Sequence, residues 1–154
     1  PHISRDLAER ALTRLRASNA LREQVCALVE LHDYPLGQEE KIVRRCLARL
    51  GEEDVRRLLA IKKADCTGQD TFSIHLAELQ TTERLVNAVC AAGACLSLRD
   101  LAIDGHIVRA LGFTGPDIGR VLRRLLAAVV DQAVPNQPDT LCALAARWKE
   151  NEHV

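Results

Sequence analysis

A series of glycines leads into an arginine-bearing stretch between residues 96 and 130, and these residue types suit the binding of a phosphate. Gly112, Gly115 and Gly119 permit sharp turns or close backbone approach, and Pro116 suits the first position of a helix. The free N–H groups at a helix start, together with the helix dipole, favour an anion. We interpret this helix start as a candidate phosphate site, although the same pattern is also typical of ordinary helix punctuation.

Three arginines follow these glycines at helical spacing. Arg120, Arg123 and Arg124 are neighbours on one side of the predicted helix, because residues three and four apart share a face. From residue 99 to residue 124 the chain has five arginines and three aspartates, a local surplus of two positive charges. The other members of this count are Arg99, Arg109, Asp100, Asp104 and Asp117. Since the formal net charge of the whole chain is zero, phosphate binding has to come from such a local patch.

A histidine and an aspartate stand side by side at His32 and Asp33, a pair that can bind a divalent metal ion or share a proton. Asp65, in an apolar-flanked helical stretch, and His2, near the first residue, are candidates to join them in space. The alternative is an incidental pair at the end of a helix, where the dipole favours a histidine, and periodicity alone favours that alternative. The remaining histidines are isolated in the sequence and receive no role: His75, His106 and His153.

Helices must position all of these residues, since no segment alternates in the manner of a strand. Hydrophobic residues make up 47% of the chain and aromatic residues only 3%, so the core has to be built from Leu, Ala, Val and Ile. Apolar spacing predicts helices over residues 4–16, 19–32, 38–50, 52–68, 73–94, 105–111, 116–133 and from 139 onward. The fold class is therefore all-α, a helical bundle over residues 1–95 followed by a smaller helical module over residues 96–154.

Particular residues are expected to begin and end these helices. Asn19 is predicted to cap the second helix, and Gly51 to end the third. Ser97 and Asp100 have the spacing of a capping box, in which each side chain accepts from the backbone of the other. The helix from Pro116 is expected to bury six side chains: Ile118, Val121, Leu122, Leu125, Leu126 and Val129.

Six cysteines form no CxxC pair and have no histidine at zinc-finger spacing, which argues against a zinc site. Most have apolar neighbours, as expected of reduced thiols in the cytoplasm. The longest apolar run, near residues 125–130, is too short to span a bilayer, so we expect a soluble cytoplasmic protein without membrane contact. The chain has no P-loop, GxSxG or HExxH motif, and without any methionine it is expected to be part of a longer protein.

Three blocks of sequence, in order, resemble the C-terminal portion of bacterial tRNA nucleotidyltransferases, the CCA-adding enzymes of the family that also contains poly(A) polymerases. PHISRDLAERALTRLRASNALREQVCALVELHD is similar to the second half of their HD-type helical body. LLAIKKADCTGQ is similar to the stretch that holds the final aspartate of HD domains, here Asp65. CLSLRDLAIDGHIVRALGFTGPDIGRVLRRLLAAVVDQAVPN is similar to the tail module and is the most specific block. The resemblance implies an N-terminally incomplete HD-like body over residues 1–95 and a tail over residues 96–154.

In this family, body and tail grip tRNA by its shape and backbone, so that the 3′ end reaches a catalytic head. The resemblance implies tRNA as the partner of this chain and the following RNA-binding residues: Arg99, Arg109, Gly115, Gly119, Arg120, Arg123 and Arg124. The metal-binding carboxylates and the nucleotide contact of the head have no counterpart among these 154 residues. We therefore expect no catalytic residue and no cofactor in this chain, which is inactive alone, and we expect Mg²⁺ and CTP or ATP to act with an N-terminal head.

The leading hypothesis is thus a binding module that positions the tRNA 3′ end for CTP- and ATP-dependent CCA addition. The alternative is an HD-type metal-dependent phosphohydrolase that uses His2, His32, Asp33 and Asp65. The early histidines of a complete HD domain are missing, so these four residues are interpreted as remnants that hold no metal. A third hypothesis is a purely structural role, in which the second part of the chain, residues 96–154, serves as an oligomerisation surface. Apolar helix faces near residues 1–33 are expected to lack partners, which predicts self-association such as a homodimer.

Overall fold

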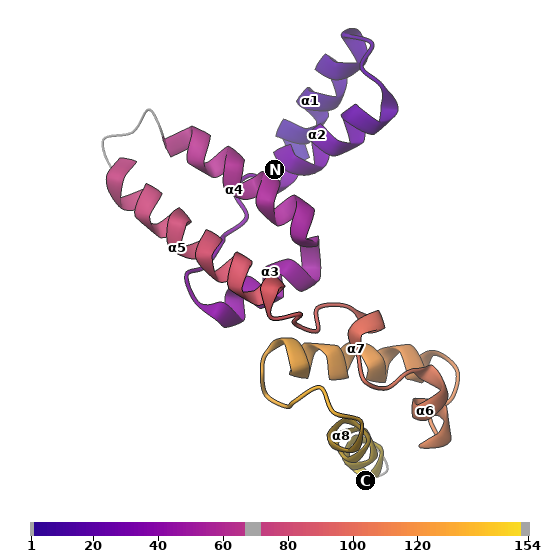
Figure 1. Cartoon of the computed structure of the whole chain (residues 1–154). Helices are drawn as coiled ribbons and strands as arrows, with labels where there is room; N and C mark the ends of the chain where they lie inside the picture. The colour runs from indigo at the N-terminus through magenta and orange to yellow at the C-terminus, as the bar shows by residue number, and fades with distance from the viewer. Residues whose placement is uncertain (1, 67–71, 152–154) are drawn as a thin grey trace.

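The computed structural model describes residues 2–66 and 72–151, without the side chains of residues 2, 72 and 73. Its regular elements within these ranges are helical, which confirms the all-α prediction. They are α1 (His2–Arg14), α2 (Asn19–Leu31), α3 (Glu40–Leu50), α4 (Glu52–Cys66), α5 (Phe72–Ala91), the 3₁₀ helix η1 (Leu98–Asp100), α6 (Gly105–Ala110), α7 (Pro116–Val130) and α8 (Pro138–Asn151). Figure 1 shows three successive groups of helices rather than one round bundle: the α1–α2 pair, α3 to α5, and α6 to α8.

Local signals set most helix ends. Gly51 ends α3 at a φ of +82°, and its N–H donates to the Leu47 carbonyl at 2.9 Å. The capping box of Ser97 and Asp100 is present around η1. The predicted cap of α2 at Asn19 is wrong by one residue, because the extended backbone of Ser18 lets its hydroxyl accept from the Leu21 N–H at 3.3 Å.

Two hydrophobic clusters lie in successive parts of the chain. The first is formed by α3, α4 and α5 and buries Val43, Cys46, Leu47, Val55, Leu59, Cys66, Leu79, Val86 and Val89. The second is formed around α7 and buries Cys95, Leu101, Ile103, Val108, Phe113, Val121, Leu125, Val129, Leu141 and Ala145. The division of the chain into domains at residues 95 and 96 stays a prediction, since α3 also contacts α7.

A polar contact joins the two clusters where α3 meets the end of α7. The Arg45 guanidinium donates twice to the Asp131 carboxylate, from Nε at 2.6 Å and from Nη2 at 2.7 Å. Lys41 lies 3.8 Å from the same carboxylate, and Gln132 donates to Glu40 at 2.9 Å. The hydrogen bond from Arg45 lowers the pKa of Asp131, so this carboxylate stays ionised well into the acidic range.

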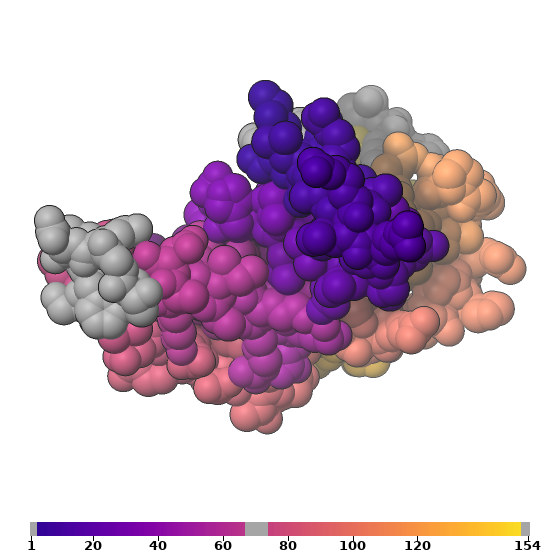
Figure 2. All heavy atoms as spheres, turned by 90° about the horizontal axis from the view of Figure 1, so that it is seen from above, coloured from indigo at the N-terminus to yellow at the C-terminus, as the bar shows by residue number. Residues whose placement is uncertain are grey.

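Helices α1 and α2 form an antiparallel hairpin that projects from the rest of the molecule (Figure 1). Helix α2 contacts α4, whereas α1 packs against α2. Figure 2 views the molecule from above and shows the hairpin in front, with no other segment over its outer side. The outer side of α1 is therefore open to solvent.

All six cysteines are free. Burial is the main cause that raises the pKa of four thiols, so they stay protonated at neutral pH: Cys26, Cys46, Cys90 and Cys95. Among the described residues, no helix combines the length and the apolar character needed to cross a membrane.

Candidate phosphate-binding surface on the arginine helix

Two glycines with positive φ shape the loop that leads into α7. Gly112 has a φ of +87° and Gly115, the N-cap of α7, has a φ of +54°. Both values lie in the region that side chains disfavour, which is why glycine serves there. Pro116 begins the helix as predicted, and a glycine cap offers no side-chain acceptor to the N–H groups of the first turn. This end of α7 therefore keeps part of its capacity to bind an anion.

Helix α8 secures this loop through Lys149. The Lys149 ammonium donates to the Leu111 carbonyl at 3.0 Å and lies 5.7 Å from the centre of the Phe113 ring. A Cβ added at Gly112 would lie 2.0 Å from the Lys149 Nζ atom, so a side chain at that position would displace the ammonium from its place over the loop. Gly112 therefore serves both its positive φ and its close contact with Lys149, whereas Gly115 serves its positive φ alone.

The three arginines of α7 point outward but have different surroundings. Arg120 forms an ion pair with Asp117, one turn earlier, which offsets much of its charge. Arg123 is exposed and folds back over Gly119, where an added Cβ would lie 3.4 Å from Nη1 of Arg123. The Arg124 guanidinium lies over the ring of Trp148, 4.0 Å from its centre. Arg123 and Arg124 therefore carry most of the uncompensated charge on this helix.

Trp148 holds Arg124 in place from α8. Its ring is half-buried and packs against the second hydrophobic cluster, and the guanidinium covers its outer side. A cation stacked on an aromatic ring loses conformational freedom before any ligand arrives. Sequence reasoning placed Trp148 only as an apolar residue of the last helix, because a contact across 24 positions leaves no periodic signal.

The aspartates near the arginines are already engaged. Asp100 accepts from the Ser97 and Leu96 N–H groups at 2.8 and 3.2 Å, and hydrogen bonds from Ser97 are the main cause that lowers its pKa. Asp104 caps α6 by accepting from the His106 and Ile107 N–H groups at 2.9 and 3.0 Å, and the bond from Ile107 is the main cause that lowers its pKa. These two carboxylates therefore accept hydrogen bonds from backbone N–H groups rather than from the arginines.

Arg99 and Arg109 lie on elements that contact α7. Arg99 is exposed on η1, and Arg109 is exposed in the last turn of α6. Both η1 and α6 pack against α7. The structure thus gathers all seven predicted residues into one small group of helices, although it does not place all their side chains on one face.

Three of the four candidate metal residues line a cavity of about 350 Å³ beside the first hydrophobic cluster. His32, Asp33 and Asp65 all line it. The His32 Nε2 atom lies 3.2 Å from an Asp33 oxygen, and its Nδ1 atom lies 2.6 Å from the Val29 carbonyl oxygen. The side chain of His2 is outside the described residues.

Sequence reasoning missed two residues at this cavity, His75 and Glu78, whose side chains face each other at 3.6 Å. Their spacing of three residues on one helix was the signal that could have revealed them. Lys62 also lines the cavity and adds a positive charge. Across residues 2–66 and 72–151, no group of three or more His, Cys, Asp or Glu side chains is arranged to hold a metal ion.

The fold and this surface define an all-α protein with an arginine-bearing helix suited to phosphate. Residues 2–145 match the family described as "tRNA nucleotidyltransferase domain 2 putative", and the chain therefore belongs to that family. Family membership supports a tRNA nucleotidyltransferase-related function. Among curated proteins and among solved structures, no significant match to this chain was found.

Proposed function

We propose that this chain is the tRNA-binding part of a tRNA nucleotidyltransferase. It positions the tRNA 3′ end for CTP- and ATP-dependent CCA addition by a catalytic head outside these residues. The family match over residues 2–145 supports the assignment, and the observation that carries it is the α7 surface with its exposed Arg123 and Arg124. RNA recognition by shape needs phosphate contacts of this kind rather than contacts to base edges.

Arg123 and Arg124 provide the main phosphate contacts in this proposal. Arg124 is held by Trp148, so binding a phosphodiester costs it little further side-chain entropy. Arg120 contributes less because Asp117 already offsets its charge. Arg99 and Arg109 extend the surface over η1 and α6, while Gly115 and Gly119 let the RNA backbone approach the start of α7.

The chain performs no chemistry in this proposal. Mg²⁺ and the nucleotide act with the head, and the protein acts in the cytoplasm. Within residues 2–66 and 72–151, no group of three or more His, Cys, Asp or Glu side chains is arranged to hold a metal ion, and the proposal assigns the metal site to the head. In this proposal the residues of this chain bind the tRNA and fix its orientation.

Reversing the charges of α7 tests the proposal. Arg120→Glu, Arg123→Glu and Arg124→Glu combined should weaken binding of the full chain to an unmodified tRNA by at least about 100-fold at moderate salt, measured by fluorescence anisotropy. The slope of log affinity against log salt should also become shallower by about one for each phosphate that the variant no longer binds. An unchanged affinity and an unchanged salt slope would sink the proposal.

A matched pair of single variants separates a local contact from a general charge effect. Arg123→Glu and Arg84→Glu alter the net charge equally, and both arginines are exposed on helices. Arg123→Glu should lower the affinity roughly tenfold, as expected for one charged hydrogen bond. Arg84→Glu, on α5, should change it less than about twofold, since long-range effects of one surface charge are screened by salt.

One observation favours the phosphohydrolase alternative, namely that His32, Asp33 and Asp65 line the same cavity. Against it, no group of three or more His, Cys, Asp or Glu side chains in the described part of the chain is arranged to hold a metal ion. A metal-content measurement on the full chain after dialysis against Mn²⁺ decides between them. Stoichiometric metal that is lost in Asp65→Asn would favour the phosphohydrolase, and its absence would remove that hypothesis.

A further inference from the structure

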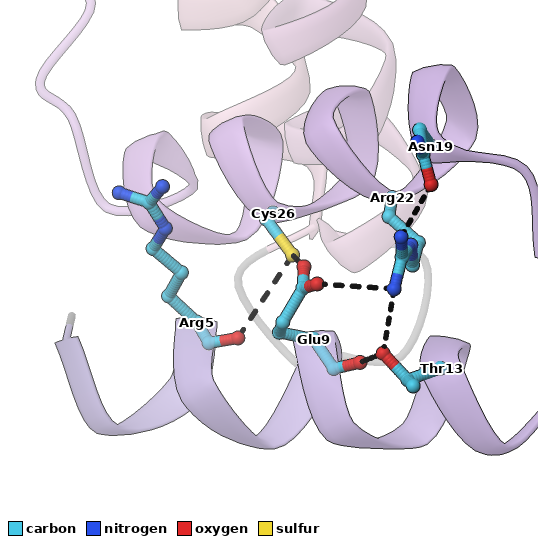
Figure 3. Close-up of polar contacts among 6 residues, drawn as sticks. All are labelled: Arg5, Glu9, Thr13, Asn19, Arg22 and Cys26. Carbon is cyan, nitrogen blue, oxygen red and sulfur yellow. Dashed lines mark hydrogen bonds and ion pairs between the residues drawn. The ribbon is translucent and has the colours of Figure 1, made fainter.

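The α1–α2 hairpin has its polar side chains on the inside. Figure 3 shows Glu9 and Thr13 of α1 pointing at Arg22 of α2. Arg22 donates to the Thr13 hydroxyl at 2.9 Å and lies 3.5 Å from the Glu9 carboxylate. Cys26 donates to Glu9 at 3.2 Å, and Arg5 pairs with Glu30 at 2.8 Å. Charged and polar groups thus occupy the contact that apolar side chains occupy in most helix pairs.

Four apolar residues lie on the opposite, outward side of α1, whereas its other apolar residues, Ala8 and Leu12, are half-buried. Ile3, Leu7 and Leu15 are 77%, 57% and 76% exposed, and Ala11 between them is exposed as well. The spacing of four residues places them in one stripe. Leu15 continues this stripe beyond the end of α1, because its N–H still donates to the Ala11 carbonyl at 3.0 Å. A continuous apolar stripe of this kind marks an interaction surface.

We propose that a second copy of this chain covers the stripe, with the two α1 helices antiparallel and related by a two-fold axis near residue 9. This register is self-complementary in shape, since it places Ile3 opposite Leu15 of the second copy and Leu7 opposite Ala11. An interface between identical patches on two copies is the commonest way in which soluble proteins dimerise.

The charges beside the stripe agree with the same register. Asp6, Arg10 and Arg14 lie along one edge of the stripe, as their helical spacing requires. Antiparallel pairing about residue 9 brings Asp6 between Arg10 and Arg14 of the second copy, displaced by about 3 Å along the axis from each. Parallel pairing about a two-fold axis along the helices would place this edge on opposite sides of the contact in the two copies, so Asp6 would not meet Arg10 or Arg14. The zero net charge of the chain adds no long-range repulsion between copies.

A single helix pair makes a small contact, so the dimer should be weak and should depend on concentration. Sedimentation of the full chain from about 1 µM to about 1 mM covers the affinities expected for such a contact. The weight-average mass should rise from 17.0 kDa toward twice that value. A mass of 17.0 kDa over the whole range would overturn the proposal.

Two single variants test whether the stripe forms the contact. Leu7→Ser should weaken the dimer at least tenfold, because it removes the central apolar side chain. Ile74→Ser is the matched control, since Ile74 is 63% exposed on α5, outside the hairpin, and should leave the mass unchanged. A dimer that withstands Leu7→Ser would place the contact elsewhere and contradict the proposal. Circular dichroism checks that both variants keep their helices.

A charge exchange tests the register itself. Asp6→Arg alone, and Arg10→Asp with Arg14→Asp, should each weaken the dimer at least tenfold, because like charges then face each other across the two-fold axis. An equimolar mixture of these two variants should restore association, since every opposed pair is again of opposite sign. A mixture that stays monomeric would overturn the antiparallel register. This experiment uses no tRNA, so its outcome is separate from that of the phosphate contacts on α7.

Discussion

Helices α1 and α7 carry similar residues but turn them in opposite directions. Each has three arginines and a set of Leu, Ile or Val side chains. In α7 the apolar residues Val121, Leu125 and Val129 are buried while the arginines lie outside. In α1 the polar Arg5 and Glu9 face the neighbouring helix and Leu7 faces solvent. An amphipathic pattern therefore predicts two faces, and it does not say which face is inside.

The difference follows from what surrounds each helix. Helix α7 packs against α3, α6, α8 and η1, and an apolar side chain on its inner side meets several partners. Among the described helices, α1 packs against α2 only, and the inner face of α2 presents Arg22 and Cys26 to it. The inner contact of α1 is consequently satisfied by hydrogen bonds. Helix α7 therefore completes a hydrophobic core, whereas the apolar face of α1 remains exposed to solvent.

Truncating one leucine on each helix gives the largest expected contrast. Leu125→Ala removes a fully buried side chain and should lower the free energy of unfolding by about 2 to 5 kcal/mol. Leu7→Ala should change it by less than about 0.5 kcal/mol in dilute monomer, because the side chain is already exposed. Urea unfolding followed by the fluorescence of Trp148 suits Leu125, since that tryptophan packs against the same cluster. Equal losses of unfolding free energy in the two variants would contradict the difference in burial between the two leucines.

Substitutions of two glycines in the loop before α7 test whether Lys149 of α8 constrains the path of that loop. Gly112→Ala should cost about 2 to 3 kcal/mol, because the added Cβ displaces the Lys149 ammonium from the Leu111 carbonyl in addition to the strain of a positive φ. Gly115→Ala should cost about 1 to 2 kcal/mol, since its φ is positive but the surrounding space is open. In a Lys149→Ala background the two losses should become alike. If Gly112→Ala remained the more damaging of the two there, the displacement of Lys149 would not be its cause.

The smallest effect is expected where α7 meets α3. Asp131→Asn should lower stability at neutral pH by about 1 kcal/mol or less, as the pair with Arg45 is partly exposed. The pKa of Asp131 is lowered in the folded state, so its contribution is present above the ordinary pKa of an aspartate and is lost as the pH falls through the lowered value. The variant and the parent should converge in urea titrations once the pH has fallen through that lowered value. A difference that persists there would assign the effect to something other than the charge.

Local chemistry made much of the fold predictable. The glycine at position 51 and the box of Ser97 and Asp100 act within one helical turn, so their sequence spacing is enough to place helix ends. The error at Asn19 has the same scale, because two adjacent residues are both good caps and the backbone selects Ser18. The spacing of His75 and Glu78 places them side by side on one helix, but their position at the cavity of His32 depends on the packing of α5.

The sequence by itself determined where helices form. It also determined that Arg120 and Asp117 are neighbours, because residues three apart lie side by side on any helix. Only the tertiary structure decided that Arg124 lies over Trp148 and that Arg45, 86 positions away from Asp131, binds it. It likewise decided which side of α1 faces solvent. The physical reason is that helix geometry sets neighbours within a turn, whereas the partner across a helix contact depends on how whole faces pack.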